Sequence, residues 1–350
     1  MSSKKTILVA PLNWGLGHAT RCIPIIDALL ANNYDVLLAS DGVALALLRK
    51  EYPQLPFKEL PGYDISYAKK KHFFKVQMLL QSPKMLRAAN IERKLVAQWV
   101  DEGLVDGIIS DNRLGVRNEK VTSVFITHQL EVLSGATTGI SSKLHKQVIK
   151  KFDRCWVPDT RQKPNLSGRL GHPSKLPENT DYIGPLSRFK KEDLSKKYDY
   201  LVLLSGPEPQ RSMLEQRLLD AFENTEKKVL FVLGKTLEQQ TRELRSNLEI
   251  VSFMTSEELE RAMNSSEVII SRSGYTTIMD LAVLEKKALF IPTPGQYEQE
   301  YLAKRMSAQG LVPYVTQDRF SLDSLNKVPL YAGLRLADRQ FDLSGLFAHF

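Results

Sequence analysis

The sequence contains only two cysteines, Cys22 and Cys155, among its 350 residues. This scarcity excludes a disulfide framework and a thiolate-rich zinc or iron–sulfur site, and it suits a reducing compartment. Long apolar runs are also missing, since none approaches the roughly 18–20 residues that a membrane span needs. The apolar stretch that follows Met-Ser-Ser-Lys-Lys is too short for the core of a signal peptide. We therefore expect a cytoplasmic protein.

The composition is otherwise ordinary, with 43% hydrophobic and 25% charged residues, which excludes wholesale disorder. Lys and Arg outnumber Asp and Glu by 48 to 40, giving a net charge of +8. This modest excess is compatible with nucleic acid, anionic lipid or a phosphorylated substrate. Apart from one cluster, the basic residues are dispersed, and they are not interleaved with exposed aromatics. We therefore expect no nucleic-acid partner.

Short apolar runs alternate with helical patterns twice along the chain, which predicts βαβ units and two parallel sheets. Runs such as Leu-Val-Leu-Leu-Ser are apolar on both faces, as in strands that helices cover on both sides. The expected strands are 6–10, 35–40, 57–60, 106–110, 123–127 and 155–158 in the first half, and 200–205, 228–234, 248–254, 267–271 and 287–292 in the second.

The pattern predicts an α/β protein of two doubly wound, Rossmann-like domains that face each other across a cleft. Residues 161–191 are rich in Pro, Gly, Ser and Lys, and they are interpreted as a linker with some ordered loop. We expect the first domain at 1–187, the second at 188–335, and a tail at 336–350 that can pack back on the first domain.

The residues that follow each strand carry the functional prediction, because ligands bind beyond the carboxyl ends of strands in open parallel sheets. After the first strand, Gly15 and Gly17 allow the backbone to approach a ligand closely, and the helix that follows favours negative charge. His18 lies in this glycine-rich turn and is expected to face the crevice. A packing or capping imidazole is the alternative.

Polar groups also follow the fourth and fifth strands, at Asp111 and His128. An Asp beside His18 would orient the imidazole and raise its basicity, as a general base requires. A cap on the next segment is the alternative role of Asp111. His128 is expected to contact a ligand or substrate, and the remaining histidines are expected at the surface: His72, His145, His172 and His349.

The second half has its own set of turns after strands. Ser205-Gly206-Pro207 is a small-residue turn able to meet phosphate oxygens. Ser271-Arg272-Ser273-Gly274 brings backbone N–H groups, hydroxyls and a guanidinium to one point, which suits a diphosphate. Asp280 is spaced to reach a ribose diol, and Glu298 and Gln299 suit sugar hydroxyls. Each turn alone can be a simple cap, but at consecutive strand ends they predict one ligand site.

Two segments, Ile270-Ser-Arg-Ser-Gly-Tyr-Thr-Thr-Ile-Met-Asp280 and 288–303, resemble the donor-binding region of glycosyltransferase family 28. The loop with Gly15, Gly17 and His18 is similar to the N-terminal Gly-Gly-x-Gly-His loop of that family. The resemblance implies a GT-B fold that binds a nucleotide sugar mainly through its second domain. It also implies inverting transfer from a UDP-sugar to a hydroxyl acceptor, which in this family can be lipid-linked.

The resemblance further implies a role for each matching residue. These roles are a ribose-binding acid at Asp280, a diphosphate loop at Ser273 and Gly274, a base-holding segment at Phe253 and Met254, a contact to donor hydroxyls or phosphate at Gln299, and a catalytic histidine at His18. Two turns depart from the family pattern: Ser205-Gly206-Pro207 replaces Gly-Gly-Ser, and Asn13-Trp14 replaces the first glycine of the N-terminal loop.

No Asp-x-Asp pair occurs in the chain, although such a pair holds a divalent metal in the other large transferase fold. We therefore expect no metal and no cofactor, with leaving-group charge met by helix N-termini, hydroxyls and Arg272. Two other enzyme classes remain open. A sugar-nucleotide epimerase shares this architecture, and Asp41 after the second strand suggests an NAD-dependent oxidoreductase.

One basic cluster stands out at residues 69–94, where eight Lys or Arg accompany a single acid, Glu92. Apolar residues are interspersed, and a helical segment of this kind can lie among lipid headgroups. We expect peripheral contact with an anionic inner membrane face. A solvated helix that covers the sheet is the alternative.

Overall fold

The computed structural model describes residues 4–63, 74–235, 239–336 and 342–350, which fall into two compact units. Unit 1 contains residues 4–63, 75–186 and 342–350. Unit 2 contains residues 187–336 and Phe74. The division after Leu186 lies one residue from the predicted boundary, and the tail at 342–350 belongs to unit 1.

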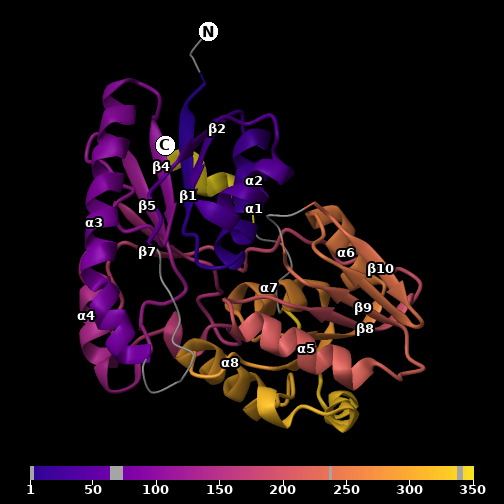
Figure 1. The fold of residues 1–350 in the computed structure, drawn as a ribbon. Coiled ribbons are helices and arrows are strands. Elements are labelled where there is room, and N and C mark those ends of the chain that lie inside the picture. The colour runs from indigo at the N-terminus through magenta and orange to yellow at the C-terminus, as the bar shows by residue number, and fades with distance from the viewer. Residues whose placement is uncertain (1–3, 64–73, 236–238, 337–341) are drawn as a thin grey trace. The chain divides into compact units, whose positions relative to one another are not determined.

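Unit 1 is built on a seven-stranded sheet with the order β3-β2-β1-β4-β5-β6-β7 (Figure 1). All neighbouring strands in it are parallel. Its strands are β1 (Thr6–Pro11), β2 (Asp35–Ser40), β3 (Phe57–Glu59), β4 (Gly107–Asp111), β5 (Thr122–Ile126), β6 (Arg154–Val157) and β7 (Thr180–Tyr182). All five residues of β4 are buried, as predicted for a strand covered on both faces.

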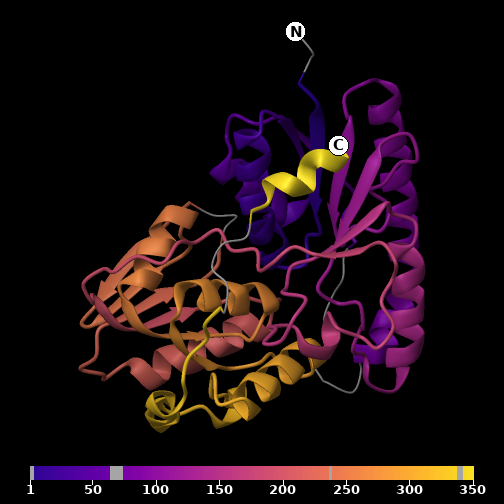
Figure 2. The same cartoon turned by 180° about the vertical axis from the view of Figure 1, so that it is seen from behind.

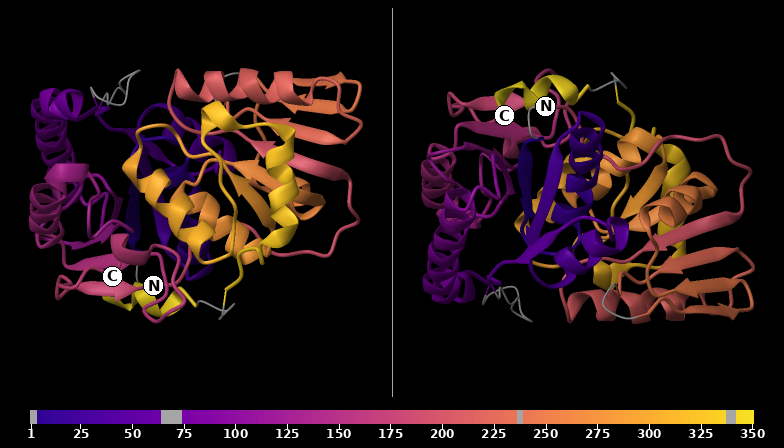
Figure 3. Two further views of the ribbon diagram at one scale, coloured as in Figure 1. Left: turned by 90° about the horizontal axis from the view of Figure 1, so that it is seen from below. Right: turned by 90° about the horizontal axis from the view of Figure 1, so that it is seen from above.

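Helices cover both faces of this sheet. Helices α1 (Gly17–Ala31) and α2 (Gly42–Glu51) lie on one face, and α3 (Phe74–Asp101) and α4 (Thr138–Ile149) lie side by side on the other (Figures 1 and 3). Val96 and Trp99 of α3 pack into the core against Leu8 of β1 and Ile108 of β4. Two short 3-10 helices, η2 (Gly135–Thr137) and η3 (Gly168–Leu170), occur in the connections after β5 and β6.

The tail packs on unit 1 through the 3-10 helix η6 (Ser344–His349), drawn in yellow in Figure 2. Phe347 is buried and contacts Tyr34, whose hydroxyl donates a hydrogen bond of 3.0 Å to the Phe347 carbonyl. The ring of Phe350 fills the space beside Gly107, where a Cβ would lie only 2.4 Å from it. The tail therefore supplies apolar side chains to the core of the first domain.

Unit 2 is built on a six-stranded sheet with the order β10-β11-β9-β8-β12-β13. Its elements are β8 (Tyr198–Leu203), α5 (Gln210–Phe222), β9 (Val229–Val232), β10 (Arg242–Arg245), β11 (Leu248–Val251), α6 (Ser256–Asn264), β12 (Ser266–Ser271), α7 (Tyr275–Leu284), β13 (Lys287–Phe290), α8 (Tyr297–Ala308), η4 (Gln317–Arg319) and η5 (Leu322–Leu330). One face packs on α5 and η5 through Leu218, Phe222 and Leu325.

Two strands were not predicted. β7 has three residues and lies inside the segment interpreted as a linker, where it pairs with β6. β10 is the antiparallel edge strand of unit 2, and all four of its residues, Arg-Glu-Leu-Arg, are exposed. A charged edge strand lacks the apolar alternation on which the prediction depends.

Each sheet has one point at which the strand order reverses: between β1 and β4 in unit 1, and between β8 and β12 in unit 2. At such a point the connections leave toward opposite faces, and a crevice opens beyond the carboxyl ends of the strands. The loops after β1 and β4, and those after β8 and β12, are therefore where ligands are expected.

Candidate active site

The loop after β1 places His18 in the first turn of α1. The loop turns at Gly15, whose φ of 79° favours glycine, and no atom of a described residue lies within 4 Å of a Cβ built there. The N-cap residue is Leu16, and no side chain in the described part of the chain caps the helix. The start of α1 thus combines an open backbone turn with a polar side chain at the switch point of unit 1.

The imidazole of His18 is paired with the carboxylate of Asp111. Asp111 is the last residue of β4, directly opposite Pro11 of β1, and it is fully buried. Its Oδ1 lies 2.8 Å from Nδ1 of His18. The His18 side chain is 14% exposed, and its Nε2 makes no hydrogen bond to a described residue and is not buried. One ring nitrogen is therefore fixed, and the other is accessible.

Arg21, one turn further along α1, completes this cluster from within the core. Its side chain is 1% exposed, and its guanidinium binds both oxygens of Asp111. Nη2 also lies 2.8 Å from Nδ1 of His18. In one tautomer, Nδ1 of His18 carries the proton and donates it to Asp111. Nη2 of Arg21 then still donates to Oδ1 of Asp111. That tautomer leaves the lone pair of Nε2 free.

The charge states in this cluster suit proton abstraction. Burial lowers the pKa of His18. The charge of Asp111 raises this pKa and the charge of Arg21 lowers it, and the net change is a decrease. Burial alone would raise the pKa of Asp111, but the charges of Arg21 and His18 hold it at about 2. At neutral pH, a neutral imidazole therefore faces an ionised carboxylate.

In unit 2, the loops after β8 and β13 approach each other at Gly206. This residue has a φ of 102°, and a Cβ built on it would lie 3.8 Å from Oγ1 of Thr293. Thr293 is 2% exposed, and its hydroxyl has no hydrogen-bond partner among the described residues. Ser205, on the other side of the turn, is half-buried. A polar atom without a partner thus lies beside a glycine turn at the carboxyl ends of the strands.

The loop after β12 leads into α7 through Ser273 and Gly274. Gly274 is the N-cap residue and has no side chain to cap the helix, and among the described residues only Thr277 comes as near as 4.0 Å to a Cβ built there. Ser273 is buried, and its hydroxyl donates to the carbonyl of Gln299 at 2.8 Å. Oε1 of Gln299 accepts from the backbone N of Thr293 at 2.8 Å. These two side chains tie the loops together.

The guanidinium of Arg272 does not reach the loop surface, contrary to the prediction that it meets a diphosphate. It is 1% exposed and turns under the loops, where it donates to four oxygens. These are the carbonyls of Ile291, Pro292 and Gln210 and Oε1 of Gln317. Direct contact with a ligand would break this arrangement.

Asp280 lies on α7 and is 7% exposed. Its Oδ1 accepts a hydrogen bond of 2.7 Å from Ser187, whereas Oδ2 makes none to the described residues. Burial raises its pKa to about 6, against the charge of Arg188 and the Ser187 bond. Nη1 of Arg188 donates to Ser256, the first residue of α6. Ser187 and Arg188 lie in the predicted linker, so sequence reasoning missed both.

Comparison with known proteins identifies the second domain. Residues 201–332 match the model of the glycosyltransferase family 28 C-terminal domain. An uncharacterized glycosyltransferase of Methanosarcina mazei is 23% identical over 346 residues, covering 90% of this chain and 87% of that protein. The UDP-N-acetylglucosamine–N-acetylmuramyl-(pentapeptide) pyrophosphoryl-undecaprenol N-acetylglucosamine transferase of Buchnera aphidicola is 24% identical over 349 residues, covering 95% and 92%. The protein is a glycosyltransferase whose second domain is that of family 28.

The fold of this glycosyltransferase is that of solved glycosyltransferases. The glycotransferase of kitacinnamycin superposes with a TM-score of 0.61 at 13% identity, covering 94% of this chain and 90% of that one. The prediction of a GT-B fold with two Rossmann-like domains is confirmed.

Three histidines of the glycosyltransferase differ from the sequence predictions. His128 is 4% exposed, and its Nδ1 accepts from Arg21 at 3.0 Å, so it supports the buried cluster and is not an open ligand contact. His172 stacks on Tyr182 and lies 3.2 Å from the carboxylate of buried Asp159. The Nε2 of His145 is also buried. His72 lies outside the described residues, and His349 is exposed.

Asp41, which suggested an NAD-dependent oxidoreductase, is occupied by contacts within unit 1. Its carboxylate binds the fully buried Arg113. It also accepts a hydrogen bond of 2.9 Å from Nδ2 of Asn13. Nε of Arg113 donates to the carbonyl of Pro11, and its Nη1 donates to buried Glu92 at 2.6 Å. Asp41 thus anchors the loop after β1. The spacing of His18 and Arg21 on one helix face could have indicated Arg21, but nothing in the sequence indicated this second network.

The remaining predicted donor residues flank the switch point of unit 2. Phe253 and Met254 follow β11, and each is 8% exposed. The carbonyl of Phe253 accepts from Gln240 at 2.9 Å, and Thr255 and Glu258 cap α6 just beyond. Glu298 is half-buried in the first turn of α8. Their contacts with a donor remain predictions.

Proposed function

We propose that this family 28 enzyme transfers a sugar from a UDP-sugar to a hydroxyl acceptor, with inversion and without a metal. The observation that carries the proposal is the family match over 201–332, which includes every loop that meets at the β8–β12 switch point. The name of the Buchnera aphidicola relative supports a UDP-sugar as the donor. Among the described residues, no three His, Cys, Asp or Glu side chains group as a metal site requires.

In the proposed donor site, the ribose binds Oδ2 of Asp280 and the base lies against Phe253 and Met254. The diphosphate meets the uncapped start of α7 at Gly274 and the turn at Gly206. Oγ1 of Thr293 offers it a further hydrogen bond. The sugar hydroxyls meet Glu298 and Nε2 of Gln299, which makes no hydrogen bond within the described part of the chain.

In the proposed reaction, Nε2 of His18 takes the proton of the acceptor hydroxyl. The acceptor oxygen bonds to the anomeric carbon as the bond from that carbon to the phosphate oxygen breaks, and UDP leaves with the electron pair. A single displacement inverts the anomeric configuration. Asp111 holds the proton on Nδ1 and stabilises the imidazolium that forms, and Arg21 fixes both groups.

Asp280→Asn is expected to reduce the affinity for uridine and for UDP by the same factor of about tenfold, because both contain the ribose. Isothermal titration calorimetry measures both affinities. In the wild type, uridine affinity should also fall as the pH drops below about 6, where Asp280 takes up a proton, whereas Asp280→Asn should show no such fall. Unchanged affinities would remove Asp280 from the donor site.

A stability measurement separates this effect from misfolding. The pKa of Asp280 in the folded state lies above its ordinary value of 3.8, so the fold binds this proton more tightly than the unfolded chain does. Stability therefore falls as the pH rises from 4 through 6, and Asp280→Asn should be at least as stable as the wild type at pH 7.5. A weaker binder that is not less stable has lost a ligand contact.

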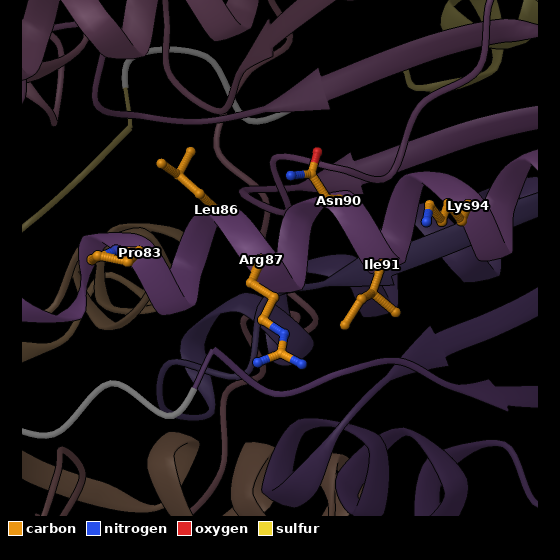
Figure 4. Close-up of a pocket in the computed structure, with 6 residues that line it drawn as sticks. All are labelled: Pro83, Leu86, Arg87, Asn90, Ile91 and Lys94. Atoms are coloured by element: carbon orange, nitrogen blue, oxygen red, sulfur yellow. The ribbon is translucent and has the colours of Figure 1, made fainter.

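We further propose that the acceptor is lipid-linked and that α3 and α4 face an anionic membrane. On α3, Leu86 is 64% exposed beside exposed Arg87, Ile91 and Lys94, and these residues line a surface hollow (Figure 4). On the neighbouring α4, Ile140 and Leu144 are exposed. Residues 69–73 of the predicted segment lie outside the described residues. No helix in the described part of the chain is long and apolar enough to span a bilayer.

The double variant Arg87→Glu/Lys94→Glu is expected to bind vesicles containing phosphatidylserine about 30-fold or more weakly, since each cation contributes about 1 kcal/mol near an anionic surface. Co-sedimentation measures the bound fraction. Lys227→Glu/Lys228→Glu makes the same change in charge at exposed positions of unit 2 and should bind like the wild type. Equal recovery of the wild type on neutral and anionic vesicles would indicate a soluble acceptor.

A further inference from the structure

Arg272 is a buried cation that has no carboxylate partner among the described residues. Its four hydrogen bonds go to three backbone carbonyls and the neutral amide of Gln317, at 2.7 to 3.2 Å. Its Nε–H group is buried and has no partner in the described part of the chain. The oxygens around it satisfy some of its donors but supply no opposite charge.

Two other arginines among the described residues are as deeply buried, and they differ in this respect. Arg21 is bound to Asp111, and Arg113 is bound to Asp41 and Glu92. Each of these cations is neutralised within unit 1. Arg272 is thus an exception to the rule that a buried charge is paired, and the exception occurs at the switch point of unit 2.

Burying the unpaired charge of Arg272 costs free energy, and the charge is not lost by deprotonation. Burial lowers the pKa of Arg272 to about 10, which still leaves the guanidinium protonated at neutral pH. A hydrophobic side chain of similar size would avoid the desolvation penalty. The chain therefore holds an uncompensated positive charge in its folded state.

This charge lies under the three loops that converge at the carboxyl ends of β8, β12 and β13. Arg272 itself begins the loop before Gly274, and its Nη2 binds the carbonyl of Gln210 at the end of the turn that contains Gly206. Its Nη1 binds the carbonyl of Pro292, the residue before Thr293. Two buried hydroxyls lack partners among the described residues: Ser271 Oγ, at the end of β12, and Thr293 Oγ1, in the loop after β13.

We propose that Arg272 is a buried counter-charge for the diphosphate of the donor, acting from beneath the loops without touching the ligand. The inference rests on the proposed function, which supplies a diphosphate above these loops. A fixed charge in a water-poor setting acts more strongly on the dianionic diphosphate than on a neutral nucleoside. Because the departing UDP gains negative charge as the glycosidic bond breaks, Arg272 should lower the barrier as well as bind the donor.

A series of ligands with increasing charge tests this assignment: uridine, UMP and UDP. Calorimetry on the wild type should give affinities that rise along the series. Arg272→Gln should lose about tenfold or more of its affinity for UDP, less for UMP, and under twofold for uridine, as one buried charge predicts at an effective dielectric constant of about 20. Arg272→Lys retains the charge, so it should keep most of the wild-type ratio of UDP affinity to uridine affinity.

Two further measurements distinguish a buried counter-charge from a diffuse surface charge and from a purely structural arginine. Arg217→Gln removes the same charge from an exposed site on α5, so any effect on UDP should be small and should vanish at about 0.5 M salt, whereas that of Arg272→Gln should persist. A purely structural Arg272 would make Gln and Lys variants lose uridine and UDP equally. If Arg272→Gln does not fold, Gln317→Glu decides, because it places a carboxylate on the guanidinium of Arg272: a ratio of UDP affinity to uridine affinity equal to that of the wild type overturns the proposal.

The outcomes separate this inference from the proposed function. A wild-type enzyme that binds neither uridine nor UDP would overturn both. A wild-type enzyme that prefers UDP to uridine, with the same preference in Arg272→Gln, would leave the donor site intact and remove Arg272 from it. With a native donor and acceptor, Arg272→Gln should also lower kcat more than it raises KM.

Discussion

Replacing His18 by Ala is expected to lower kcat by about 10²–10⁴-fold, the usual contribution of a positioned general base, while UDP still binds with nearly wild-type affinity. Affinity should be preserved because the proposed donor contacts belong to unit 2, whereas His18 belongs to unit 1. Turnover with a native donor and acceptor measures the first quantity, and calorimetry measures the second.

The pH profile adds a second test. Burial holds the pKa of His18 below its ordinary value of 6.5, so kcat/KM of the wild type should stay constant to below pH 6.5 before it falls. In His18→Ala, kcat/KM should not show this fall at low pH. Full turnover by the variant would show that another group takes the proton.

The chain offers a matched control for His18. His172 also lies in unit 1, is 18% exposed and pairs through a ring nitrogen with a buried carboxylate, Asp159. His172→Ala removes the same kind of His–Asp contact away from the β1–β4 switch point. It should lower the free energy of unfolding but change kcat by less than about twofold. A loss as large as that of His18→Ala would indicate a general effect of cavity formation.

Replacing Asp111 by Asn is expected to lower the free energy of unfolding by about 3–5 kcal/mol, because the buried guanidinium of Arg21 then has no anionic partner. Urea unfolding at pH 7 measures the difference. The pKa of Asp111 is about 2 in the fold against an ordinary 3.8, so its stabilising effect is present above pH 3.8 and is lost as the pH falls through 2. The two proteins should converge in stability toward pH 2.

A double-mutant cycle identifies the cause of that loss. Arg21→Met alone leaves Asp111 as an unpaired buried anion, and it should be comparably destabilising. The combination of Arg21→Met with Asp111→Asn removes both charges and should cost less than the sum of the single changes by at least about 1 kcal/mol. Additive losses would mean that the two side chains contribute independently and that no ion pair holds His18 in place.

The sequence was a good guide wherever position along a strand decides the geometry. His18 and Asp111 meet because His18 follows β1 and Asp111 ends β4, and neighbouring parallel strands bring their carboxyl ends together. The apolar runs located eleven of the strands, all except β7 and β10 among those in the described residues. Those two are short or charged, so no apolar alternation marks them.

The direction in which a loop side chain turns could not be predicted in the same way. Arg272 follows β12 as expected, but its guanidinium turns under the loops because carbonyls from the neighbouring loops are available there. Asp41 turns toward Arg113, which the sequence places 72 residues away. Such choices depend on contacts from several distant segments, and a single sequence without structure does not reveal them.

The tail at 342–350 has a consequence for how the two domains form during synthesis. A ribosome makes residues 187–336 as one stretch, so the sheet of unit 2 can assemble before the tail is made. Until then, the nascent first domain lacks Phe347 and Phe350, and the apolar surface around Tyr34 and Gly107 stays uncovered. The domain that is begun first is thus completed second, because its last apolar contacts form only after the tail is made.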